Sequence, residues 1–165
     1  MSQKIAIAII HGVGIQKKDF ADGIIKKLTI SFSKHIRKYS RYPDKELVIK
    51  PVFWSPVLQN LEIELWERLK TGGRMSYKKV RKFIVDFAAD AIAYQPSPHD
   101  RETYDNIHSV FAKTLKQLSK EAGAKAPLCI ISHSLGTIIA SNYIYDLEVC
   151  KKKKIISAKV CKYMA

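Results

Sequence analysis

A serine in a short segment of small residues is the first feature of the sequence that could do chemistry. Ser134 stands in the middle of Ser132–Gly136, directly after the apolar run Leu128–Ile131. A strand that turns sharply into a helix at such a point holds its serine in a strained backbone conformation with positive φ and exposes the hydroxyl group. The dipole and free N–H groups of the following helix N-terminus would favour negative charge beside that hydroxyl. The spacing therefore predicts a nucleophilic serine at Ser134.

The neighbours of this serine suit such a turn. Ser132 and Gly136, two residues before and two after, are small enough to avoid clashes across it. The N–H group of Leu135 is positioned to donate a hydrogen bond to a developing oxyanion. His133 lies inside the turn, where we expect it to pack locally or face solvent and not to reach back to the serine as a base.

A second glycine motif follows the first apolar run of the chain. The run Ile5–Ile10 predicts a strand buried on both faces, and it ends in His11-Gly12-Val13-Gly14. With the serine turn, this motif resembles the α/β-hydrolase superfamily of the lipase and esterase type, over roughly residues 4–148.

The resemblance implies an ester-hydrolysing site. Val13 would supply the second oxyanion N–H group, and His11, Gly12 and Gly14 would line the site together with His133 and Gly136. His11 is expected to be a structural residue of the oxyanion turn. The implied substrate is a small acyl or lipid-like carboxylic ester, cleaved through an acyl-serine intermediate.

The chain departs from that family after the serine. The family places its acid and its histidine downstream of the nucleophile, whereas the acids that follow Ser134 are Asp146 and Glu148 and no histidine follows it. The general base is therefore unassigned, and the sequence predicts a truncated hydrolase. His99 is a weak substitute for the base, His108 is expected to be a core histidine, and Asp90 is expected to lie at a helix surface.

Strands alternating with helices predict the elements that must position these residues. The predicted strands are Ile5–Ile10, Leu47–Trp54 and Leu128–Ile131, with a fourth candidate near Ile155–Val160. The predicted helices are one capped by Asp19, then Val57–Leu69, Tyr77–Tyr94, Arg101–Glu121 and Leu135–Leu147. Pro51 favours an edge position for the second strand.

Such a pattern predicts an α/β fold with a small parallel sheet of three or four strands flanked by helices. The resemblance implies the strand order 2-1-3-4. We expect residues 1–150 to form the truncated hydrolase-like domain and residues 151–165 to form a basic tail. The missing half of the sheet would leave an open edge, which predicts a homo-oligomer or a partner that covers it.

Composition narrows the remaining classes. The chain has 165 residues, 47% of them hydrophobic, and no apolar run long enough to span a membrane. Its three cysteines lack CxxC spacing, so no disulfide framework or zinc site is expected and a cytoplasmic location is predicted. Lys17 stands where a dinucleotide-binding motif needs glycine, so no nucleotide cofactor is predicted. No other cofactor and no metal is predicted either.

The net charge of +14 leaves two alternatives to an active esterase. The tail from residue 151 holds six lysines and no acid, although no specific nucleic-acid motif is present. One alternative is a catalytically inactive hydrolase-like scaffold. The other is a basic module that binds anionic partners, whose binding would fall steeply with salt.

Overall fold

Three parallel strands form the centre of the structure, a computed structural model that describes residues 3–58, 91–96 and 101–153. β1 (Ile5–Ile10) lies between β2 (Leu47–Val52) and β3 (Leu128–Ser132). The predicted α/β class, with a small parallel sheet flanked by helices, is confirmed. Residues 155–160 lie outside the described residues, so the fourth strand and the full 2-1-3-4 order stay predictions.

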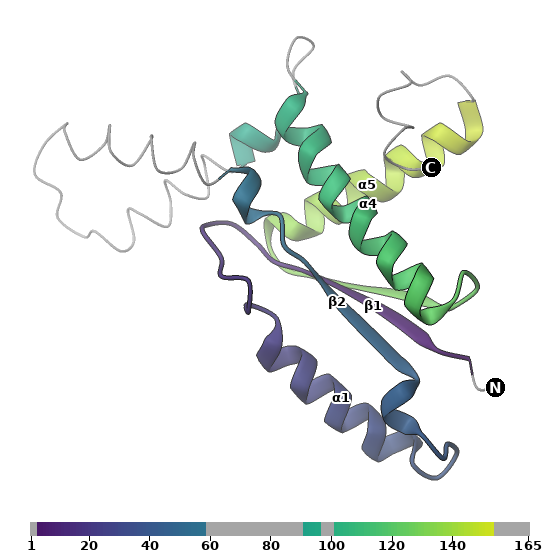
Figure 1. Cartoon of the computed structure of the whole chain (residues 1–165). Helices are drawn as coiled ribbons and strands as arrows, with labels where there is room; N and C mark the ends of the chain where they lie inside the picture. Colours follow the sequence, from purple (N-terminus) through teal and green to yellow (C-terminus); the bar gives the residue numbers. More distant parts are fainter. Residues whose placement is uncertain (1–2, 59–90, 97–100, 154–165) are drawn as a thin grey trace, which may run out of the picture.

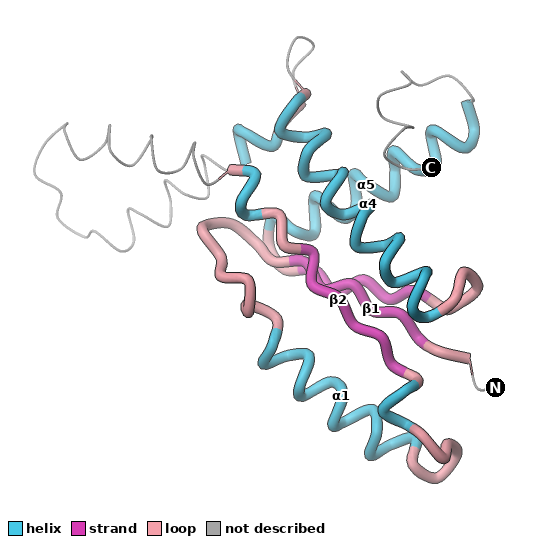
Figure 2. Tube along the Cα trace, in the orientation of Figure 1, coloured by secondary structure: helices cyan, strands magenta, loops and turns pink. Residues whose placement is uncertain are grey.

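Helices cover both faces of this sheet (Figure 1). α1 (Asp22–Ile36) lies on one face, and α4 (Glu102–Ala122) and α5 (Leu135–Lys153) lie on the other. Figure 2 shows the three strands as a central layer between these helices. Because side chains alternate along a strand, β1 contributes to two separate cores.

The larger core lies between the sheet and the pair α4 and α5. Ala6, Ala8 and Ile10 of β1 join it, and so does an apolar stripe along α4. Of that stripe, Tyr104, Ile107, Phe111 and Leu118 are buried, and Leu115 packs partly buried against them. The smaller core contains Ile7, Ile9 and Ala21, with Ile25 and Leu28 of α1 packed against it.

The register aligns the carboxyl ends of the three strands at one end of the sheet. Ile10 is aligned with Val52 of β2 and with Ser132 of β3. The glycine turn after β1 and the serine turn after β3 therefore leave the sheet at the same level. This alignment makes contact between the two motifs possible.

Several predicted element ends are wrong. The residue that precedes α1 is Ala21, which makes no side-chain cap, and Asp19 instead accepts the Asp22 N–H through its main-chain carbonyl at 3.0 Å. β2 ends at Val52, because the chain turns into the short 3-10 helix η2 (Ser55–Val57). A second short 3-10 helix, η1 (Pro43–Lys45), occupies the turn before β2.

The later boundaries also differ. α5 continues to Lys153, past the predicted end at Leu147, and it overlaps the start of the predicted tail. The domain division itself stays a prediction. Two helices are predicted between residues 57 and 94, but residues 59–90 lie outside the described residues. At the start of the first helix, Val57 belongs to η2. At the end of the second helix, residues 91–94 are helical.

Both outer strands have one partner among the described residues. β2 pairs with β1, which agrees with the edge position predicted from Pro51. β3 likewise pairs with β1 alone within the described ranges, so Leu128 and Cys129 are exposed and not buried as the apolar run suggested. No helix in the described part of the chain is long and apolar enough to cross a lipid bilayer.

Candidate functional site

Ser134 sits at the junction of β3 and α5 in the predicted strained conformation. Its φ is 52°, and no other non-glycine residue has a positive φ in the described ranges. The left-handed region costs an L-residue about 1–2 kcal/mol because Cβ approaches the following carbonyl. The Ser134 side chain is exposed to solvent. A strained and exposed serine is what the strand–turn–helix pattern predicted.

Two glycines let the turns after β1 and β3 come into contact. A Cβ atom on Gly12 would lie 2.8 Å from Ser134 Cβ and 3.0 Å from His133 Nδ1. A Cβ atom on Gly136 would overlap the carbonyl oxygen of His11 and lie 3.1 Å from the Ile10 oxygen. Side chains at these positions would therefore push the two motifs apart.

Backbone hydrogen bonds complete the junction. The His133 N–H donates to Ile10 O at 3.2 Å, which extends the pairing of β1 and β3 into the turn. The Thr137 N–H donates to Ser134 O at 2.9 Å, as expected for the first turn of α5. Within the described residues, the N–H groups of Val13 and Leu135 donate to no backbone or side-chain acceptor. These predicted oxyanion donors flank the contact between Gly12 and Ser134.

His11 holds the oxyanion turn in place and does not act on Ser134. Its Nδ1 lies 2.8 Å from Gly12 O, and because a carbonyl only accepts, Nδ1 carries the proton. Its Nε2 accepts the Ser55 N–H at 3.3 Å, and its ring stacks on Trp54 with centroids 4.6 Å apart. Burial lowers the pKa of His11 to about 4, so the ring is neutral at pH 7.

None of the described histidines hydrogen-bonds to Ser134. His11 is engaged by backbone groups, His35 bonds to Ser31 O on α1, His108 lies beside Tyr94, and His133 is exposed beside the serine. His99 and Asp90, the other residues considered from the sequence, lie outside the described residues.

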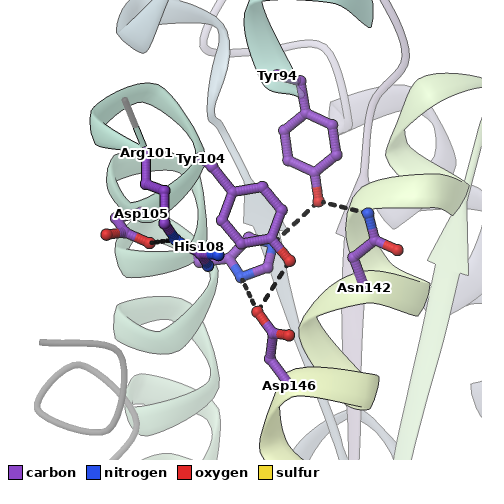
Figure 3. A network of polar contacts seen from close by, with 7 residues as sticks. All are labelled: Tyr94, Arg101, Tyr104, Asp105, His108, Asn142 and Asp146. Carbon is purple, nitrogen blue, oxygen red and sulfur yellow. Dashed lines mark hydrogen bonds and ion pairs between the residues drawn. The ribbon is translucent and has the colours of Figure 1, made fainter. Parts of the chain in front are cut away.

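A buried polar network occupies the contact between α4 and α5 (Figure 3). The Tyr94 hydroxyl accepts from Asn142 Nδ2 at 3.2 Å and lies 3.0 Å from His108 Nε2. On the other side, the Tyr104 hydroxyl donates to Asp146 Oδ2 at 2.8 Å. Because the Tyr94 hydroxyl accepts from Asn142, it can donate its own proton to His108 Nε2. Nε2 is then an acceptor, so the ring proton lies on His108 Nδ1, 3.5 Å from Asp146 Oδ2.

The network stabilises the helix pair and does not serve the serine. Asp146 follows Ser134 by three turns of α5, about 17 Å along the helix. Burial lowers the pKa of His108 to about 3, with Arg101 acting in the same direction, so the imidazole is neutral at pH 7. Sequence analysis placed His108 in the core but missed its partners. The only signal was the i, i+4 spacing of Tyr104 with His108 and of Asn142 with Asp146.

Comparison of the chain with protein-family models, with curated proteins and with solved structures finds no match. Within residues 3–58, 91–96 and 101–153, no three His, Cys, Asp or Glu side chains converge to hold a metal ion.

The backbone strain at Ser134 predicts a reversal of the usual preference for alanine over glycine in helical segments. We expect Ser134→Gly to be about 1 kcal/mol more stable than Ser134→Ala, because glycine adopts positive φ without strain. The matched pair is Ser141→Gly and Ser141→Ala at an exposed position within α5, where alanine should be about 1 kcal/mol more stable. Urea unfolding of the four variants measures both differences. The same order of stability at both positions would contradict a strained serine.

Proposed function

We propose that the protein is a serine hydrolase that cleaves a carboxylic ester through an acyl-serine intermediate. The observation that supports the proposal is the positive φ of Ser134 between β3 and α5, with Gly12 packed against its Cβ atom. Nothing in an ordinary strand-to-helix connection requires an exposed serine in a strained conformation. The strain therefore favours a serine retained for its chemistry.

The proposed reaction has two steps. Ser134 Oγ attacks the carbonyl carbon of the ester, the alcohol leaves, and water then hydrolyses the acyl-serine to release the acid. The negative charge on the carbonyl oxygen is stabilised by the N–H groups of Val13 and Leu135 and by the N-terminus of α5. Two such donors contribute several kcal/mol, about 3 kcal/mol for each donor removed in comparable sites. The proton of Ser134 passes to a base outside the described residues, which returns it to the departing alcohol; in the second step the base takes a proton from water and returns it to Ser134 Oγ.

Covalent labelling tests this proposal. A fluorophosphonate probe phosphonylates an activated serine, and the intact mass of the protein then rises by one adduct. We expect the wild-type chain and Ser141→Ala to be labelled, and Ser134→Ala to remain unlabelled. Ser141 is a suitable control because it is an exposed serine on the same helix. Equal labelling of wild type and Ser134→Ala would show that Ser134 is not the nucleophile.

One observation favours a second candidate, a catalytically inactive hydrolase-like scaffold. No described histidine hydrogen-bonds to Ser134, and a serine without a base is a poor nucleophile. Loss of triad partners typically removes about 10⁴-fold of the rate. A wild-type chain that is folded by circular dichroism and takes no label would support the scaffold over the enzyme.

A further inference from the structure

A basic cavity opens at the amino ends of β1 and β2, at the end of the sheet opposite to Ser134. Its volume is about 420 Å³, within the range of small-ligand pockets. Its charged and aromatic lining residues are Lys4, Arg41, Lys45, Glu46, Tyr39 and Tyr42. We propose that this basic cavity binds the phosphate group of a small phosphorylated ligand.

The charge of the lining suits a phosphate dianion. Three cationic side chains, Lys4, Arg41 and Lys45, and one carboxylate, Glu46, leave two net positive charges. Arginine binds phosphate through two parallel N–H groups, and lysine acts as a compact point charge beside it. Together they match both the charge and the shape of a phosphate better than those of a carboxylate.

Tyr42 organises two of the cations in advance of binding. The guanidinium carbon of Arg41 lies 5.6 Å from the centroid of the Tyr42 ring, and Lys45 Nζ lies 5.1 Å from it. Contacts of cations with the face of an aromatic ring reduce the freedom of long side chains at exposed sites. Less ordering is then needed when an anion binds.

Hydrogen bonds hold the wall of the cavity. Glu46 accepts from Ser40 Oγ at 2.5 Å through its carboxylate and from the Ile5 N–H at 2.7 Å through its carbonyl. The Tyr42 N–H donates to Ser40 Oγ at 3.1 Å. Lys4 Nζ donates to Glu121 O at 2.9 Å, which ties the residue before β1 to the end of α4. The loop between α1 and β2 (Figure 1), which lines the basic cavity, is therefore held in a defined shape.

The basic cavity is independent of the proposed hydrolase site. The six residues of β1 separate the two ends of the sheet by about 20 Å. A phosphate bound beside Lys4 would not contact Ser134. Phosphate binding at the basic cavity and covalent labelling of Ser134 are therefore independent tests of two separate sites.

Calorimetric titration with inorganic pyrophosphate tests the proposal. At about 0.15 M salt, where long-range surface attraction is screened, we expect saturable binding with one site per wild-type chain. The double variant Arg41→Gln/Lys45→Gln should bind about tenfold more weakly or worse, because two charge-assisted contacts are lost. The control, Lys26→Gln/Lys27→Gln, removes the same charge from exposed positions on α1 and should bind within about twofold of wild type.

Two results would overturn the basic cavity as a phosphate site. One is the absence of saturable binding to the folded wild-type chain. The other is an equal loss of affinity in the two double variants, which would show attraction to net charge alone. Circular dichroism establishes that each variant is folded before titration.

A second arm distinguishes the carrier of the phosphate. Sedimentation with phosphatidylcholine vesicles, with and without phosphatidylinositol phosphate, tests a lipid headgroup. Pyrophosphate binding without sedimentation supports a soluble phosphorylated ligand in the basic cavity. Sedimentation that depends on the phosphoinositide and is lost in Arg41→Gln/Lys45→Gln supports the same cavity with a lipid-borne phosphate.

Discussion

Gly136→Ala is expected to lower the free energy of unfolding by several kcal/mol, about 3 kcal/mol or more. The added Cβ atom would overlap the carbonyl oxygen of His11 and lie 3.1 Å from the Ile10 oxygen. Both are main-chain atoms at the end of the central strand β1, so neither can rotate away. Relief would require β1 and α5 to separate, and both contribute to the larger core.

Gly23→Ala is the matched control for this substitution. Gly23 lies in the first turn of α1, and a Cβ atom there would meet nothing within 4 Å. Alanine should leave stability unchanged or raise it by up to about 1 kcal/mol. Urea unfolding followed by circular dichroism measures both variants. A Gly136→Ala protein as stable as Gly23→Ala would contradict the close approach of the two turns.

Acidification from pH 7 to pH 5 is expected to lower the free energy of unfolding by about 3 kcal/mol through two buried histidines. Burial lowers the pKa of His11 to about 4 and that of His108 to about 3, against 6.5 in the unfolded chain. The unfolded chain therefore binds more protons as the pH falls below 6.5. The stabilising contribution is complete above pH 6.5 and is lost as the pH falls toward the folded-state values. Each histidine contributes a slope of up to about 1.4 kcal/mol per pH unit.

His108→Gln isolates one of the two contributions. Among the described residues, the groups that face the ring are Asp146, Tyr94, Tyr104 and Tyr143, and Arg101 acts on it electrostatically. The substitution should lower stability at pH 7 by disturbing the network, and it should also reduce the slope between pH 7 and pH 5 by about half. A lower stability of His108→Gln at pH 7 would not distinguish the loss of a titrating group from the loss of packing. A smaller dependence of its stability on pH does distinguish them.

The wild-type chain provides the reference for that slope, because both buried histidines are present in it. A His108→Gln protein with the wild-type slope would show that His108 does not contribute to acid unfolding.

Local sequence patterns were enough to predict most of the elements that frame the site. The continuous apolar run of β1 and the helical spacing of apolar residues in α4 depend only on neighbours in the chain. α4 ends before Gly123, whose φ of 104° suits the residue that follows a helix. The predicted ends of elements are wrong where the path of the chain in the folded structure, and not the local sequence, determines them. β2 stops at Val52 because the chain turns into η2, and Asp19 does not cap α1 because one more turn precedes the helix.

The partners of polar side chains could not be predicted in the same way. Tyr94, His108 and Asp146 become neighbours through the rotation of α4 and α5 about their own axes. Helical periodicity identifies which residues share a face, but it does not say which face of another helix they meet. The basic cavity depends similarly on Lys4 and the loop before β2 reaching the same edge of the sheet.

Strand, turn and helix signals are short-range, so they predict an α/β chain with one glycine turn after its first strand and a serine turn after its third. The tertiary structure brings these two turns together, with Gly12 against Ser134 although more than 100 residues separate them. It also decided that both ring nitrogens of His11 are taken by the backbone. These contacts depend on the pairing of β1 with β3 and with β2, which brings distant residues to one end of the sheet and which no local pattern encodes.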